Sequence, residues 1–98
     1  MAGVADPVEV ASGTDDVQAY TGQCRLLGWS FREDAGTPAV ATVRLFDGLD
    51  NTGTLIAAIE LAESGSDHEW YGPQGVWVKV GVFVEKVAGT SEGSVYTG

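Results

Sequence analysis

Large apolar residues alternate with polar or small residues along several short stretches of the chain, and this period of two is typical of half-buried β-strands. The pattern predicts strands over residues 24–33 and 39–47. The side chains expected on the core-facing side of these two strands are Leu27, Trp29, Phe31, Ala41, Val43 and Leu45. Glycine or proline interrupts the pattern at intervals of about ten residues, as is typical of all-β sandwiches and barrels.

The clearest strand signal is the valine-rich run of residues 76–87. Its even-numbered valines share one face, which we expect to lie against the core, whereas Trp77 and Phe83 share the other face. The preceding residues Gly72–Gly75 are a strong turn signal. Gly81, in the middle of the run, predicts a bulge or a hairpin bend that divides it into two strands.

Residues 54–62 fit two kinds of element. A period of two places Leu55, Ile59 and Leu61 on one face of a strand, while helical spacing aligns Leu55, Ala58 and Ile59 nearly as well. We favour the strand, because nine residues are short for a helix without a cap and the neighbouring segments are strands.

The first 23 residues are the least regular part of the chain, because small and polar side chains dominate there. Their only apolar anchors are Val8, Val10 and Val17. We therefore expect residues 1–23 to form an extended N-terminal arm with short edge strands near residues 8–11 and 17–20. Deletion of Met1–Asp16 is then expected to leave the domain folded and to weaken assembly.

Residues 24–98 are expected to form the folded domain. Shorter strands are predicted over residues 67–71 and 94–97, which brings the count to between seven and nine, with short connections. This pattern predicts an all-β fold, an antiparallel β-sandwich of the jelly-roll type.

Composition and charge narrow the classes of function. Of 98 residues, 44% are hydrophobic and 19% are charged, as in ordinary globular domains. Fourteen acidic against five basic residues give a net charge of −9, which argues against nucleic-acid partners and against anionic membrane surfaces. We also expect no transmembrane helix and no secretory signal in residues 1–7, and therefore assembly in a cytoplasm.

Candidate catalytic and metal-binding residues are few. The only histidine, His68, lies between Asp67 and Glu69, which point to the opposite face of a strand and so form no orienting pair. The only cysteine, Cys24, is expected to be a small buried side chain without a disulfide partner. The protein is therefore predicted not to be an enzyme and to need no cofactor.

One polar loop offers oxygen donors close together. Asp47, Asp50 and Asn51 lie within five residues, which leaves a calcium site open as a possibility. We favour a turn in which these side chains bind nearby backbone, as aspartate and asparagine commonly do.

Aromatic residues supply the main candidate for a binding surface. Trp70 and Tyr71 lie together before the predicted turn, and Trp77 and Phe83 lie on the face opposite the valines. Tryptophan and tyrosine commonly anchor protein interfaces, and arginines on adjacent strands add positive charge. The predicted partner-binding residues are Val8, Val10, Val17, Trp70, Tyr71, Trp77, Phe83 and Arg44.

Five segments together resemble small β-sandwich virion proteins of tailed bacteriophages, particularly those infecting actinobacteria. The segments are Leu27–Glu33, Ala41–Gly48, Leu55–Leu61, Trp70–Gly75 and Gly81–Val87. The resemblance implies a capsid decoration protein of the virion, bound to the outer face of the shell. It implies the major capsid protein or another virion protein as partner, self-association as a homotrimer, and an arm that reaches a neighbour.

Two alternatives remain open at this point. Tail and head-fibre proteins of the same viruses use similar sandwiches. A carbohydrate-binding module would use Trp70, Tyr71 and Trp77 as platforms on which sugar rings stack.

Overall fold

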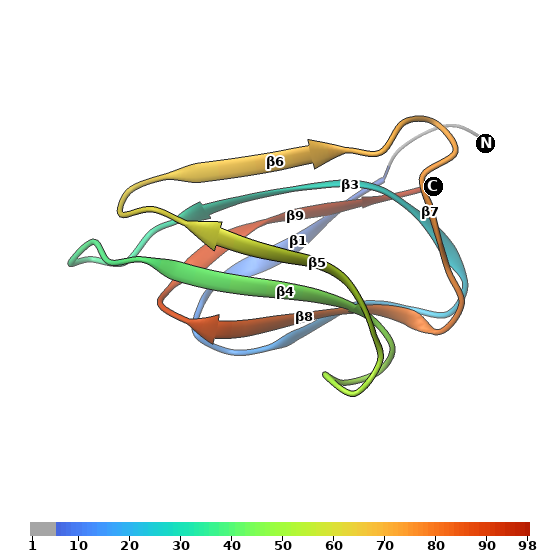
Figure 1. Ribbon diagram of the computed structural model, residues 1–98, viewed down its shortest axis with the longest axis horizontal. Helices are drawn as coiled ribbons and strands as arrows, with labels where there is room; N and C mark the ends of the chain where they lie inside the picture. The colour runs from blue at the N-terminus through green and yellow to red at the C-terminus, as the bar shows by residue number, and fades with distance from the viewer. Residues whose placement is uncertain (1–5) are drawn as a thin grey trace.

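The computed structural model describes residues 6–98, in which nine β-strands and no helix are found (Figure 1). The strands are β1 (Asp6–Gly13), β2 (Val17–Thr21), β3 (Cys24–Glu33), β4 (Ala41–Asp47), β5 (Thr54–Leu61), β6 (Ser66–Trp70), β7 (Val76–Val78), β8 (Gly81–Ala88) and β9 (Ser91–Thr97). All strand pairs are antiparallel. The predicted all-β class is confirmed.

The strands form two packed sheets. Sheet A has the order β1-β9-β3-β6, and β7 pairs with β3 beside the end of β6. Sheet B has the order β2-β8-β4-β5. In Figure 1 the two layers lie one above the other, and the chain crosses repeatedly between them. With β6 and β7 sharing one position, this is the strand order of a jelly roll, so the predicted β-sandwich is confirmed.

The core lies between the sheets and is built from alternate residues of each strand. Its fully buried members include Val10, Leu26, Ala41, Val43, Leu45, Val78, Val82, Val84 and Val95. Burial of a valine or leucine side chain contributes about 1.5–3 kcal/mol, so these residues provide most of the driving force for folding. The prediction that Ala41, Val43 and Leu45 face the core is confirmed.

In β3, the leucine that belongs to the main core cluster is Leu26 and not Leu27. Leu26 joins Trp29 and Phe31 in the core, whereas Leu27 is buried outside that cluster, against Gly75. The cause is a register shift between Leu26 and Gly28 in the pairing with β9. An inserted residue interrupts the alternation of faces, so Leu27 is buried as predicted but lies outside the main core cluster.

The run of residues 76–87 is divided between the two sheets. β7 belongs to sheet A and β8 to sheet B, with the corner at Lys79–Val80, next to Gly81 as predicted. Val80, which was expected in the core, therefore lies at the corner and is exposed. Because the chain changes sheet, Trp77 and Phe83 lie on the outer faces of different sheets and not on one shared face.

Residues 54–61 form the strand β5, and the helical alternative is excluded. Leu55 was expected to face the core, but it is exposed and pairs with Phe46. A register shift between Leu45 and Phe46 turns the first part of β5 outward. Ile59 and Leu61, after the shift, are buried as predicted.

The expected arm is, from residue 6 onward, part of the sandwich. β1 pairs with β9 at the edge of sheet A, and β2 pairs with β8 at the edge of sheet B. Val10 is completely buried, and Val8 and Val17 pack against the core. The short edge strands were predicted correctly, but these valines alternate inward and hold both strands in the fold. Residues 1–5 of the expected arm lie outside the described residues.

A buried lysine joins the two sheets at one end of the sandwich. The Lys86 ammonium group on β8 donates hydrogen bonds to the carbonyl oxygens of Ala11, Gly13 and Ser91, at 3.1, 3.1 and 2.8 Å. Burial lowers the pKa of Lys86, and the negative charges of nearby carboxylates, of which Asp34 has the largest effect, partly oppose this. The carbonyls of β1 are free to accept because the β1–β9 ladder is interrupted beyond Val10.

Candidate functional site

The outer face of sheet A carries side chains in rows that run across four strands, because directly paired residues point to the same side of a sheet. We call this surface the A face. Its first row consists of Pro7, Tyr96, Gly28 and Trp70, on β1, β9, β3 and β6. The row is apolar and aromatic on both sides of a glycine, so two rings flank a strip of bare backbone.

Trp70 rests on that bare backbone. A β-carbon at Gly28 would lie 3.1 Å from the Cε3 atom of the Trp70 ring and 2.5 Å from the Glu69 carbonyl oxygen. The side chain of Trp70 is nevertheless 57% exposed. The indole is thus supported by the sheet on one side and open to solvent on the other. The absence of a side chain at Gly28 makes this arrangement possible.

The next two rows are polar. The second consists of Glu9, Ser94, Ser30 and His68. The third contains Glu92, Arg32 and Ser66, in which the Arg32 Nε donates a 2.6 Å hydrogen bond to Glu92. This ion pair is the only salt bridge found within residues 6–98. Successive rows are two residues apart along each strand, or about 7 Å.

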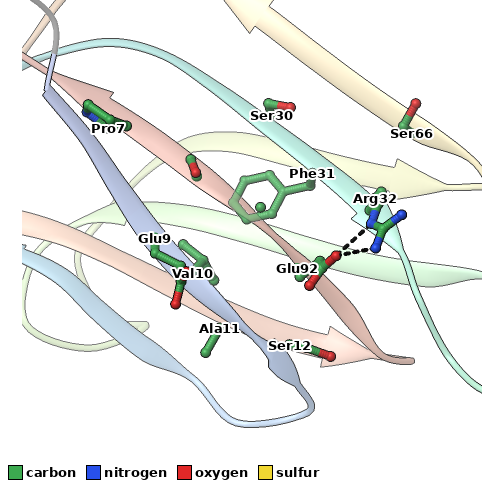
Figure 2. Close-up of a pocket in the computed structure, with 12 residues that line it drawn as sticks. Pro7, Glu9, Val10, Ala11, Ser12, Ser30, Phe31, Arg32, Ser66 and Glu92 are labelled. Atoms are coloured by element: carbon green, nitrogen blue, oxygen red, sulfur yellow. Dashed lines mark hydrogen bonds and ion pairs between the residues drawn. The ribbon is translucent and has the colours of Figure 1, made fainter.

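An open hollow of about 660 Å³ lies over the polar rows. Figure 2 shows the residues around it, with Arg32 joined to Glu92 by dashed lines. Its lining includes Pro7, Glu9, Ser30, Arg32, Ser66 and Ser94. Gly93 also lines the hollow, and a β-carbon at this position would collide with the Ser30 carbonyl oxygen. The hollow therefore has several small residues in its lining and lies beside the aromatic row.

Trp77 adds a second exposed indole to the same face. It pairs with Arg25 on β3, three residues before Gly28, and is 54% exposed. Tyr71, in contrast, turns inward, where its hydroxyl accepts a 3.1 Å hydrogen bond from the Trp29 Nε1 and its ring packs on the core. Of the aromatic residues predicted to bind a partner, the structure brings Trp70 and Trp77 to one face and removes Tyr71 from it.

The remaining predicted residues lie elsewhere. Phe83 and Arg44 are on the outer face of sheet B, where Phe83 pairs with Phe46 and Arg44 pairs with Glu85. The three N-terminal valines face the core, so they do not extend to a neighbour. The single surface expected from the sequence is therefore divided between the two faces of the sandwich.

A second exposed apolar surface lies at one end of the molecule. Four large apolar side chains are exposed there, which we call the apolar end: Tyr20, Leu49, Leu55 and Val80. Backbone hydrogen bonds from Gly22 to Val80 (2.7 Å) and from Gly48 to Gly81 (2.9 Å) hold the corners of this end together. In Figure 1 these corners are at the right of the sandwich.

The corner between β7 and β8 is fixed by Asp47. Its carboxylate accepts hydrogen bonds from the backbone N–H groups of Lys79, Val80 and Gly81, at 3.0, 2.9 and 3.4 Å. Partial burial alone would raise the pKa of Asp47, but these three donors and the Lys79 charge outweigh it and lower the pKa. Both oxygens of this carboxylate thus accept hydrogen bonds from the protein backbone.

The other two polar side chains of this loop also have protein partners. Asp50 accepts hydrogen bonds from the N–H and the hydroxyl of Thr52, which lower its pKa, and Asn51 donates to Glu85. Backbone bonding by Asp50 confirms the predicted turn. Over residues 6–98, no group of three or more histidine, cysteine, aspartate or glutamate side chains is arranged to hold a metal ion.

The two candidate reactive residues are placed as expected. Cys24 is buried, and burial, together with the charge of Asp47, raises the pKa of its thiol, which favours the unreactive protonated form. His68 is exposed in β6. Asp67 and Glu69, its neighbours along the strand, pair with Phe31 and Trp29 and so point to the other side of the sheet.

Sequence reasoning missed most of the A face. Gly28, Ser30, Ser94 and Tyr96 acquire significance only because β9 and β6 both pair with β3, far apart in the sequence. The alternation of Gly28 and Ser30 with large apolar residues indicated their shared face. Nothing local indicated which strands would lie beside them.

The described part of the chain contains no helix long and apolar enough to cross a membrane. What the A face offers chemically is non-covalent contact: flat rings, hydroxyl groups and a few charges on a rigid sheet. Comparison of the chain with protein-family models, with curated proteins and with solved structures finds no match in any of the three.

Proposed function

We propose that the protein is a structural subunit of a virus particle, a capsid decoration protein that binds the outer face of the shell and stabilises it through contacts between subunits. Its partners are then the major capsid protein or another virion protein, and further copies of itself in a homotrimer. The sequence resemblance to phage virion proteins supports this proposal, and the jelly-roll order of the strands is compatible with it.

The observation that carries the proposal is the apolar end. Four of the eight exposed large hydrophobic side chains within residues 6–98 gather there. Several exposed apolar side chains at one end of a molecule are typical of an interaction surface. Each copy would bury only a modest area, but many copies on one lattice act together, so weak single contacts still hold the layer in place.

The distribution of charge gives the subunit an orientation. Asp15, Asp16, Asp34 and Glu63 lie at the end opposite the apolar end, in or next to the connections β1–β2, β3–β4 and β5–β6. We call this the acidic end. With a net charge of −9, neighbouring subunits repel unless such carboxylates face solvent. Attachment through the apolar end leaves the acidic end pointing away from the shell.

Purification of the virus particles tests the proposal. The protein should sediment with the particles in a fixed ratio to the shell protein, and electron microscopy should show it on the outer surface. Leu49→Asp and Val80→Asp should abolish this association. Val40→Asp is a matched control, because Val40 is equally exposed but lies at the acidic end. A protein that stays monomeric and is absent from particles would contradict the proposal, and density on the tail alone would replace the capsid by the tail.

A further inference from the structure

We propose that the A face is a binding site for a neutral polysaccharide chain. One sugar ring stacks on Trp70, and the neighbouring sugars of the chain form hydrogen bonds with the polar row beside it. This site is separate from the apolar end. Attachment to a shell through that end leaves the A face open to solvent, so the inference goes beyond the proposed function and does not depend on it.

The first argument is the position and exposure of the Trp70 side chain. The apolar face of a sugar ring packs on an aromatic ring only when that ring presents a flat, accessible surface. Packing on Gly28 fixes the indole against the sheet, and its 57% exposure leaves the opposite side free. Tyr96 stands across Gly28 from Trp70 in the same row, so the platform continues onto β9.

The second argument is the row of hydrogen-bonding groups next to the platform. Ser30 and Ser94 are directly paired, and each hydroxyl both donates and accepts. Glu9 lies at one end of this row and His68 at the other. The row is about 7 Å from the Trp70 row, so the hydroxyl groups of a stacked sugar, or of the next sugar in the chain, come within its reach.

The third argument is the shape of the surface. The hollow is open and its lining includes Ser30, Ser94 and Gly93, so a chain can cross it without having to enter by its end. All contacting groups stand on four hydrogen-bonded strands, which hold them more precisely than loops would. Little ordering of the protein is then needed on binding.

The fourth argument selects the class of polymer. Glu9 and Glu92 border the hollow, and Arg32, the basic residue there, is already paired with Glu92. With a net charge of −9 in addition, the site repels polyanions, including nucleic acids and acidic polysaccharides. A proline-rich peptide also packs on exposed indoles. It offers fewer hydroxyl groups to the serine row than a sugar does, so the geometry favours the sugar.

Affinity electrophoresis of the full chain tests the site. Native gels would contain soluble β-glucan, dextran, galactomannan or arabinoxylan, all of them neutral. At least one should retard the wild-type protein, and Trp70→Ala should weaken that retardation at least tenfold, while Trp70→Phe retains part of it. Ser30→Ala combined with Ser94→Ala should weaken it severalfold. Leu55→Ala is the matched control, because Leu55 is as exposed as Trp70 but lies on sheet B.

Several results would overturn the inference. They are retardation by none of the four polymers, equal retardation of the wild type and a Trp70→Ala protein with an unchanged circular dichroism spectrum, or binding of a proline-rich peptide in place of the sugars. Particle binding is measured separately and with different variants, so a negative result for polysaccharide binding does not contradict the proposed binding to virus particles, or the reverse.

Discussion

The ammonium group of Lys86 on sheet B donates a 2.8 Å hydrogen bond to the carbonyl oxygen of Ser91 at the beginning of β9 in sheet A. Two more carbonyls, those of Ala11 and Gly13, accept from the same nitrogen. One charged group therefore satisfies three backbone acceptors contributed by β1 and β9, which are sequentially distant from each other. A buried charge with a complete set of partners joins the two layers at the acidic end.

Lys86→Met is expected to destabilise the protein substantially. Methionine fills a similar volume but donates no hydrogen bond, so three backbone carbonyls lose their partner, of which that of Ser91 is buried. An unpaired buried acceptor costs about 1–3 kcal/mol, and the two part-buried carbonyls can accept from water, so we expect a loss of about 2 kcal/mol in the free energy of unfolding. Urea denaturation measures it. Lys79→Met removes an exposed lysine and should change stability by less than about 0.5 kcal/mol. Equal midpoints for the two variants would contradict this role of Lys86.

Asp47→Asn should lower stability at neutral pH and make the protein less sensitive to acid. The carboxylate is held by three backbone N–H groups, and its pKa is lowered in the folded state. A lowered pKa stabilises the fold above the pKa of the unfolded chain, and this stabilisation is lost as the pH falls through the folded value. Because the site is partly solvated, we expect about 1 kcal/mol at pH 7.

Unfolding midpoints between pH 7 and pH 2.5 provide the measurement for Asp47. The gap between wild type and Asp47→Asn should close as the pH falls below about 4, the usual range for an aspartate. Asp67→Asn, on the exposed strand β6, should follow the wild type throughout. A gap that stays constant down to pH 2.5 would show that the charge of Asp47 is not responsible.

Deletion of residues 1–16 is now expected to unfold or strongly destabilise the domain, contrary to the expectation from the sequence. The deletion removes all of β1, including the fully buried Val10, and leaves β9 without its outer neighbour. Loss of one buried valine alone costs about 1.5–3 kcal/mol. Thermal unfolding followed by circular dichroism is the measurement. A deletion that ends at residue 5 removes no part of β1 and serves as the control, and a deletion of residues 1–16 that melts like it would restore the idea of a separate arm.

The sequence predicts the features of this fold that are set within a single strand better than those set by the pairing of two strands. Alternation within a strand is local, so the inward faces of β4 and β8 were predicted correctly. The place of Leu27 outside the main core cluster and the exposure of Leu55 both follow register shifts. A bulge is a property of two paired strands, and the sequence of one strand does not reveal at which of its residues the pairing with its partner shifts.

Prediction of the candidate site is limited in the same way, because the site depends on pairing between strands that are far apart in the sequence. The sequence indicated Trp70 and Trp77 as exposed aromatic residues, and the structure places them on one face. The match between Gly28 and Trp70 arises from pairing between β3 and β6, with some forty residues between them. Such long-range pairings follow from the packing of the whole sandwich, so hydroxyls and rings that form one surface look unrelated along the chain.

Gly28→Ala tests the link between the fold and the A face. A β-carbon at this position would lie 2.5 Å from the Glu69 carbonyl oxygen and 3.1 Å from the Trp70 ring, so both β6 and the indole must move away. Overpacking of this kind costs about 1–3 kcal/mol. We expect a lower unfolding midpoint and, because the indole loses its support, a tryptophan emission spectrum shifted toward that of a fully hydrated indole. Gly36→Ala is the matched control, because a β-carbon at Gly36 would have no neighbour within 4 Å. If Gly28→Ala kept both the midpoint and the emission of the wild type, Trp70 would not rest on the strand, and the platform assigned to the A face would have to be abandoned.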